Sequence, residues 1–190
     1  MINKALQFTS DVLDQFLRNR FGLDESKVIL NNLIESNGAV PEVNQNKIVI
    51  SLINVEKETL KPFYQRNQRL TGGSYSELSP AERFNLDLLI SSNFENYNET
   101  LRFLNSVLVF FQVNHTLDAS VSSSIPAGLN KLEFEIERIT YHQMQSLWTA
   151  MGAKYQPSVI YKMRLITIQG DQPDGFTTAI SSTANSGKQA

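Results

Sequence analysis

Apolar and polar side chains alternate in a regular pattern near the end of the chain, from residue 140 to residue 168. Thr140 and Gln143 have the spacing of a capping box, in which two side chains satisfy the open N–H groups of a helix start. An apolar stripe at i, i+3, i+4 and i+7 follows, made of Met144, Leu147, Trp148 and Met151. Gly152 stands where a left-handed residue would end the helix. The pattern predicts one helix, followed by a short connection that ends at Pro157.

The period then changes to two residues, which is typical of a strand. Val159, Tyr161, Met163 and Leu165 alternate with Ile160, Lys162, Arg164 and Ile166. Trp148, in the preceding helix, is the only tryptophan of the chain. We therefore expect this helix and this strand to close the hydrophobic core.

Earlier segments predict a further helix and four further strands. An amphipathic stripe over residues 2–21, stopped at Phe21-Gly22, predicts an opening helix that packs on the sheet. Strand patterns cover Lys27–Leu33, Asn46–Val55, Phe84–Ser91 and Leu132–Glu137. The second of these is apolar on both faces, so we expect it to lie centrally and to be covered on each side.

A long helix is predicted from a second capping-box spacing, Ser92 and Glu95, to about Val113. Its first apolar stripe contains Tyr97, Leu101, Leu104, Leu108 and Phe111, and its second contains Phe103, Val107 and Phe110. One sheet face cannot cover so wide an apolar surface. Either this is the central core helix, or part of it contacts another subunit. The element order α-β-β-β-α-β-α-β predicts an α/β (α+β) fold, a mixed β-sheet flanked by helices.

Two segments lack a sustained pattern. Residues 56–80 contain two prolines and a Gly-Gly pair, and long connections of this kind tend to be functional or mobile. We predict an extended arm there, for which a hairpin is the alternative to disorder. Residues 169–190 are rich in Ser, Thr, Gly and Gln, with little to bury. The predicted organisation is one domain over residues 1–168, carrying the arm, and a flexible C-terminal tail over residues 169–190.

Composition excludes several classes of protein. The 190 residues include no cysteine, which rules out disulfides and thiolate metal sites. The 17 basic and 19 acidic residues give a net charge of −2, which argues against a strongly electrostatic nucleic-acid binder. No apolar run approaches the roughly 18–20 residues of a membrane helix. The first residues are unlike a secretory signal. We expect a soluble protein made in the cytoplasm, without a nucleic-acid or membrane partner.

Three carboxylates are the strongest candidates for chemistry. Glu133, Glu135 and Glu137 project from one strand face and could hold a hard cation or act as a carboxylate pair. Nothing near them in the sequence completes a metal shell, so a solvated strand face is the favoured interpretation. If this strand neighbours the last one, Lys162 and Arg164 are expected to share its charged face.

The remaining candidates are weaker. His115 and His142 are the only histidines, and no Gly-x-Ser-x-Gly elbow accompanies them. Gly72-Gly73 lacks the Lys-Ser/Thr of a phosphate loop and predicts a turn at the tip of the arm. Residues 171–175 (DQPDG) lack the acidic twelfth ligand of a calcium loop and predict another turn. We predict no catalytic, cofactor or metal site, and hence no enzyme.

The arm carries the clearest interaction signal. Basic and aromatic side chains are interleaved at Lys57, Lys61, Phe63, Tyr64, Arg66 and Arg69. This composition suits an acidic protein surface or a nucleic acid, and a solvated loop is the alternative. Because long arms with aromatic side chains are costly to leave free, we treat these six residues as a hypothetical partner-binding site.

The segment SLWTAMGAKYQPSVIYKMRLITI resembles the signature region of the amino-terminal domain of cap proteins, or tail terminators, of extracellular contractile injection systems. These systems are phage-tail-like particles. The opening helix, the strand NKIVISLINVEKE, the run NLDLLISSNFENYNETLRFLNSVLVFFQ and the segment LEFEIERITYHQMQSLW are similar to that family in type and order. The most specific pieces are Leu147-Trp148, Gly152-x-Lys154-Tyr155 and Pro157-Ser158-Val159-x-Tyr161-Lys162. The resemblance covers residues 2–168.

The resemblance implies a structural role on a phage tail-terminator-like fold, with no cofactor and no reaction. Members of the family form a six-fold ring that closes the distal end of the inner tube and the sheath and anchors sheath to tube. The implied partners are other copies of the chain, the inner tube protein and the sheath protein, in a contractile particle that can be released from the cell. Trp148, Tyr155 and Tyr161 would be core residues, with Gly152 as the helix stop. Lys154 and Lys162 would be the polar residues most available for contacts.

A closed ring needs a heterologous interface, with two different patches on each subunit. The second stripe of the 92–113 helix and an exchanged arm are expected to supply these patches. One alternative is a monomeric adaptor or baseplate connector of the same particle. The other is a small hydrolase that uses Glu133, Glu135 or a histidine.

Overall fold

A six-stranded mixed sheet forms the frame of the computed structural model, which describes residues 1–35, 37–58, 67–69, 74–78, 82–122, 124–129, 131–168 and 173–178. In spatial order the strands are β1 (Val28–Leu30), β2 (Lys47–Lys57), β5 (Glu82–Asn93), β8 (Ser158–Ile168), β7 (Lys131–Ile136) and β6 (Thr116–Asp118). β1 and β2 are parallel, and the other neighbouring strands are antiparallel. A short 3₁₀ helix, η1 (Glu42–Asn44), precedes β2.

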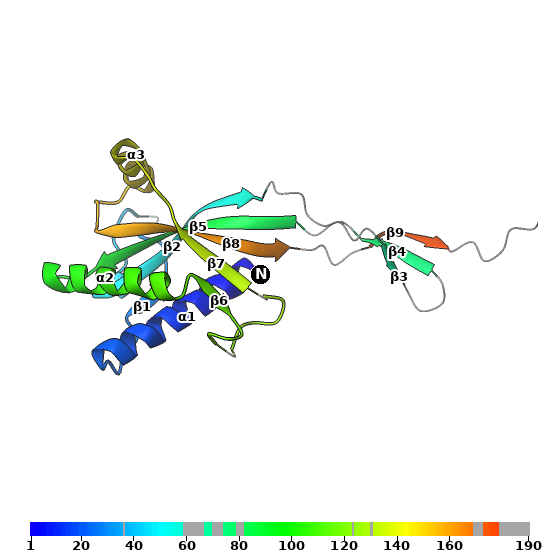
Figure 1. Cartoon of the computed structure of the whole chain (residues 1–190). Helices are drawn as coiled ribbons and strands as arrows, with labels where there is room; N and C mark the ends of the chain where they lie inside the picture. Colours follow the sequence, from blue (N-terminus) through cyan, green and yellow to red (C-terminus); the bar gives the residue numbers. More distant parts are fainter. Residues whose placement is uncertain are drawn as a thin grey trace, which may run out of the picture.

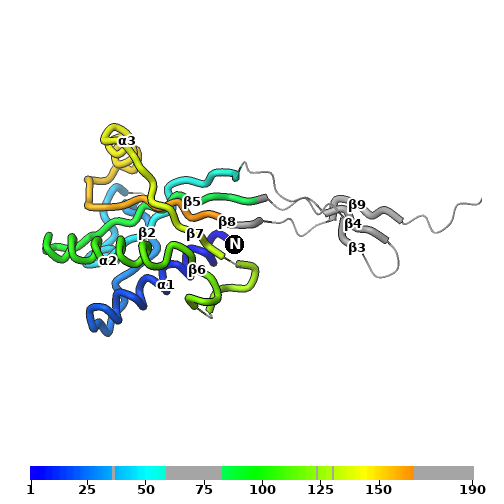
Figure 2. Tube along the Cα trace, viewed as in Figure 1, coloured from blue at the N-terminus to red at the C-terminus, as the bar shows by residue number. Residues whose placement is uncertain are grey.

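Helices cover both faces of this sheet (Figure 1). α1 (Ile2–Phe21) and α2 (Tyr97–Val113) lie on one face, and α3 (Tyr141–Met151) lies on the other. Figure 2 traces the chain from β5 through α2 on one side of the sheet, and from β7 through α3 on the other side to β8. The predicted fold, a mixed sheet flanked by helices, is confirmed.

Each face of the sheet has its own hydrophobic core. The larger core joins α1 and α2 to the sheet and includes Leu13, Leu17, Ile48, Ile50, Leu88, Ile90, Phe103, Phe110 and Met163. The smaller core lies under α3 and contains Leu33, Val49, Leu89, Trp148 and Ile160. Full burial of one such side chain contributes about 1.5–3 kcal/mol. β2 is covered on both sides only over residues 48–51, and most of its residues from Leu52 onward are exposed. It is the second strand of the sheet, and β5 and β8 occupy the centre.

The predicted ends of α1 and α3 are confirmed. Gly22 ends α1 with φ 63°, and its N–H donates to the Arg18 carbonyl. At α3, Gln143 N–H donates to Thr140 Oγ1 at 3.3 Å, and Thr140 N–H donates to Gln143 Oε1 at 2.8 Å. Gly152 ends α3 with φ 68°. Because φ is positive at both glycines, a side chain there would strain the backbone.

The predicted capping box at the start of α2 is wrong. β5 continues through Asn93, so Ser92 is a buried strand residue whose Oγ donates to the Thr100 carbonyl at 2.8 Å. The cap is Asn96, and its Oδ1 accepts hydrogen bonds from the N–H groups of Asn98 and Glu99. Asn is among the best helix caps, so the competing signal was present four residues further on.

The arm and the tail each contribute strands to a second, three-stranded antiparallel sheet. β3 (Asn67–Arg69) and β4 (Ser74–Leu78) come from the arm, and β9 (Pro173–Thr178) comes from the tail and pairs with β4. The turn predicted over residues 171–175 is therefore wrong from Pro173 onward. Proline is tolerated as the first residue of a strand, which explains the misleading signal. The turn predicted at Gly72-Gly73 lies outside the described residues, as do residues 169–172 and 179–190 of the tail.

Candidate partner-binding surfaces

The acidic face of β7 is paired with basic side chains. In the β7–β8 register, Glu135 lies opposite Lys162 and Glu133 lies opposite Arg164, so the predicted sharing of one face is confirmed. Arg164 Nη2 lies 2.6 Å from Glu135 Oε2, and Lys131 pairs with Glu133. These carboxylates therefore belong to ion pairs on the α3 side of the sheet.

Lys162 is the centre of this charged face. Its Nζ lies 2.9 Å from Glu137 Oε1, 3.0 Å from Glu56 Oε2 and 3.8 Å from Asp87 Oδ1. The side chain is only 17% exposed. Its hydrogen bonds to Glu137 and Glu56 raise the pKa of Lys162 above its ordinary value. Because its partners come from β2, β5 and the end of β7, Lys162 ties four strands together within the chain.

The other candidates for chemistry do not converge. Across the described ranges, no three His, Cys, Asp or Glu residues are placed to hold a metal ion. His142 is exposed in the first turn of α3, whereas His115 precedes β6, with its carbonyl accepting from Phe134 N–H. No helix within the part of the chain that the structure describes is long and apolar enough to cross a membrane.

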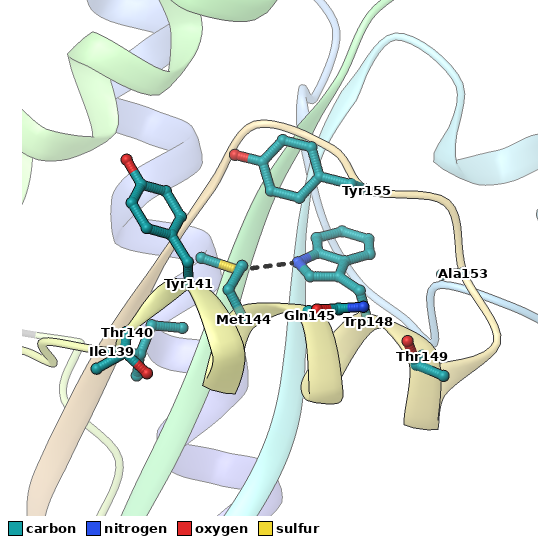
Figure 3. Close-up of a pocket in the computed structure, with 9 residues that line it drawn as sticks. All are labelled: Ile139, Thr140, Tyr141, Met144, Gln145, Trp148, Thr149, Ala153 and Tyr155. Carbon is teal, nitrogen blue, oxygen red and sulfur yellow. Dashed lines mark hydrogen bonds between the residues drawn. The ribbon is translucent and has the colours of Figure 1, made fainter.

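An open groove runs along α3 and the loop that follows it (Figure 3). It has a volume of about 650 Å³ and is lined by Ile139, Thr140, Tyr141, Met144, Gln145, Trp148, Thr149, Ala153 and Tyr155. The rings of Tyr141 and Tyr155 rise on the same side, above Met144 and Trp148. Trp148 Nε1–H donates to Met144 Sδ at 3.1 Å, which closes the floor.

The signature residues divide between the core and this groove. Trp148 and Tyr161 are buried as expected, and burial raises the pKa of the Tyr161 phenol. The expectation that Tyr155 is a core residue is wrong, because 63% of it is exposed. It lies on the loop after α3 and packs edge-on against Trp148, with ring centroids 5.5 Å apart. Tyr155 therefore forms one wall of the groove.

Four other signature residues lie in α3, in the loop after it and at the loop's exit. Leu147, in α3, is half-buried against the smaller core, and Lys154, in the loop, is exposed. Pro157 ends the loop and Ser158 starts β8, and the Pro157 carbonyl accepts from Ser92 N–H at 3.0 Å. This hydrogen bond joins the loop to β5, so the position of the groove is set by the sheet.

The second stripe of α2 does not have the role that was expected of it. The second stripe, Phe103, Val107 and Phe110, is fully buried in the larger core. In the first stripe, Phe111 is buried, whereas Tyr97, Leu101 and Leu108 are exposed. The second stripe therefore cannot supply a subunit interface, and the first stripe leaves an apolar surface uncovered.

The predicted arm site is only partly described. Lys57 is the exposed last residue of β2, and Arg69 is the last residue of β3. Lys61, Phe63, Tyr64 and Arg66 lie outside the described residues.

Residues 9–182 match the model of the Pvc16 N-terminal domain family. The chain belongs to this family. The match extends past β8 and includes β9, so the Pvc16 N-terminal domain comprises the second sheet as well as the first. None of the proteins with curated functions matches the sequence.

Two solved structures share the fold of this Pvc16 N-terminal domain. One is the sheath/tube terminator of the extracellular contractile injection system PVC in its extended state, with a TM-score of 0.63 and 14% identity. The other is the tube-terminating cap of the anti-feeding prophage, with a TM-score of 0.58 and 14% identity. They match 100% and 93% of this chain, which spans 64% and 59% of their own lengths.

Two surfaces escaped the sequence patterns. The groove had a detectable signal, because Tyr141, Met144 and Trp148 have the spacing i, i+3 and i+7 and extend the α3 stripe upstream. The sequence signal for the exposed stripe of α2 was weaker, because both stripes are apolar and only packing against α1 determines which of them is buried.

Proposed function

We propose that this chain is the ring-forming domain of a cap that terminates the tail of an extracellular contractile injection system. In this role it closes the distal end of the inner tube and the surrounding sheath as a six-membered ring and anchors sheath to tube. The observation that carries the proposal is the family match over residues 9–182, together with a fold shared over the whole chain with a sheath/tube terminator.

Its surface suits assembly better than catalysis. The strongest candidates for catalysis or metal binding were the carboxylates of Glu133, Glu135 and Glu137, and each of them is paired with Lys or Arg. Apolar surface is exposed on both sides of the sheet, on α2 and along the α3 groove. Exposed apolar patches of this kind mark interaction sites in folded proteins.

The partners in this role are other copies of the chain, the inner tube protein and the sheath protein. The basic arm, from Lys57 to Arg69, reaches the tube or the sheath. In support, the arm lies between β2 and β5 in the sequence and contributes β3 and β4 to the second sheet.

The test is to assemble particles with and without the full-length protein and to image them by electron microscopy. With the protein, tubes should end at a defined length with the sheath attached. Without it, tube length should become broad and the sheath should detach or contract prematurely. A label on the protein should mark the end of the particle opposite the baseplate.

Other results reject the proposal. Uniform, closed particles in the absence of the protein would exclude a terminator role. A label at the baseplate end, from a protein that stays monomeric, would favour the adaptor or baseplate connector. Alanine at Glu133 and Glu135 should leave assembly unchanged, whereas a hydrolase would lose activity.

A further inference from the structure

The three strands of the second sheet keep the order of three strands of the first sheet. Along the chain, β3 follows β2, β4 precedes β5, and β9 follows β8. In the first sheet β2, β5 and β8 are consecutive neighbours with antiparallel pairing. In the second sheet β3, β4 and β9 follow each other in the same order, again with antiparallel pairing. Both pairings of the second sheet therefore repeat pairings of the first.

The connection between the sheets is short and even where β9 takes part. The β5–β8 ladder extends to the pair Glu82–Ile168, and the β4–β9 ladder begins at the pair Leu78–Pro173. Three residues separate these two pairs along the chain from β4 to β5, and four separate them from β8 to β9. Because the two connections differ by one residue, β4 and β9 pair almost in the register that β5 and β8 leave.

The connection through β3 is longer and less even. The β2–β5 ladder reaches the hydrogen bond from Glu58 N–H to the Arg83 carbonyl at 2.9 Å, and pairing of β3 begins with Asn67 opposite Glu77. Eight residues lie between Glu58 and Asn67, whereas five lie between Glu77 and Arg83. β3 also pairs with β4 over three residues, and β9 pairs with it over five. Of the two neighbours of β4, β9 is thus the better placed to hold it in line with the first sheet.

We propose that β9 fixes the arm as a continuation of the first sheet and thereby presents it to its partner. This inference rests on the proposed function, in which the arm from Lys57 to Arg69 reaches the tube or the sheath. Without β9 the arm would keep a two-stranded hairpin, which is at best marginally stable in water when it is isolated. The family match agrees with this role, because it extends to residue 182 and so includes β9.

An arm that is ordered in advance should bind its partner more tightly than a free one. Ordering a flexible segment during association opposes binding, and a segment that is already held in its bound form avoids this cost. The tail strand would therefore contribute to capping without touching the tube or the sheath itself.

Two prolines in β9 test this role. Phe176→Pro combined with Thr177→Pro removes two successive N–H groups, one of which is directed toward β4 because strand N–H groups alternate in direction. In the full-length protein, amide hydrogen exchange should become about tenfold faster or more over residues 74–78 and stay unchanged over residues 86–90 of β5. Asn185→Pro combined with Ser186→Pro is the matched control, since both residues lie beyond the family match. The β9 variant should also lose most of its capping, measured as the share of particles of normal length.

A covalent link between β9 and β4 tests the inference in the opposite direction. Ser76 and Phe176 lie directly opposite each other in the register, and the chain has no cysteine of its own. In Ser76→Cys combined with Phe176→Cys, a disulfide can form because opposite residues of antiparallel strands have Cα atoms within bridging distance. The locked protein should cap particles as well as the wild type does.

The outcomes separate this inference from the proposed function. Unchanged exchange over residues 74–78 in the double-proline variant would show that β9 does not hold the arm. Normal capping by that variant, despite fast exchange, would show that the arm need not be held. Loss of capping in the locked protein, restored by reduction, would show that β9 must be released. Each of these results would overturn the inference and leave the cap role intact, whereas failure of the wild-type protein to join particles would reject the cap role itself.

Discussion

At the scale of single residues, Lys162 is the most consequential polar side chain. Its ammonium group faces Glu56, Asp87 and Glu137, so Lys162→Met would leave three carboxylates facing one another with no central cation. Because Asp87 is largely shielded from solvent, we expect the free energy of unfolding to fall by about 1–3 kcal/mol at pH 7. Urea unfolding of the full-length protein measures this loss, and Lys154→Met, at an exposed lysine, should change it little.

The pH dependence of the same variant follows from the charges. In the wild type the raised pKa of Lys162 gives a stabilisation that is fully present below its unfolded-state pKa of about 10.5 and is lost only in more alkaline solution. It therefore varies little between pH 6 and 9. The deficit in the free energy of unfolding of Lys162→Met relative to the wild type should therefore stay constant between pH 6 and pH 9, as urea unfolding at each pH would show. A deficit that disappears between pH 6 and pH 9 would contradict this account.

At the scale of elements, α3 depends on its ends. An isolated helix of 11 residues is marginal in water, so the capping box and the contact of Trp148 with the smaller core hold it in place. Thr140→Ala should destabilise the helix by about 1 kcal/mol, and Thr140→Ser should not. Fluorescence of Trp148, the only tryptophan, reports the docking of α3. If both variants lost that signal to the same degree, the capping oxygen would not be the cause.

The arm is the element that we expect to contact the tube or the sheath. Replacing Lys57, Lys61, Arg66 and Arg69 by glutamate should leave the domain folded, because Lys57 is exposed at the end of β2 and the two cores of the described residues are apolar. It should, however, stop the capping of particles, since the contact would become repulsive. Particle length and far-UV circular dichroism measure the two effects separately. Capped particles of normal length from this variant would show that the arm is not a binding site.

At the scale of the whole molecule, the sequence pattern predicted those features of the fold that depend on residues close together in the chain. Residues that are neighbours in sequence determine the stripe and caps of α3, the stop of α1 at Gly22 and the burial of both faces of β2 over residues 48–51. Which face of α2 is buried does not, because Phe103 and Leu101 are equally apolar and packing against α1 selects between them. The strand β9 escaped for the same reason: its hydrogen bonds go to β4, about a hundred residues earlier in the chain.

The same non-local logic determines how copies of the chain should associate. In a closed head-to-tail ring the last subunit forms two contacts at once, so intermediates are disfavoured relative to the free chain and the complete ring. Six chains of 21.5 kDa correspond to about 129 kDa. Mass photometry over a range of concentrations should therefore show two main species, near the mass of one chain and of six, with the ring gaining at higher concentration. A dominant dimer would instead indicate pairing of identical surfaces, and a single monomeric species, both free and in the presence of tube ends, would favour the adaptor.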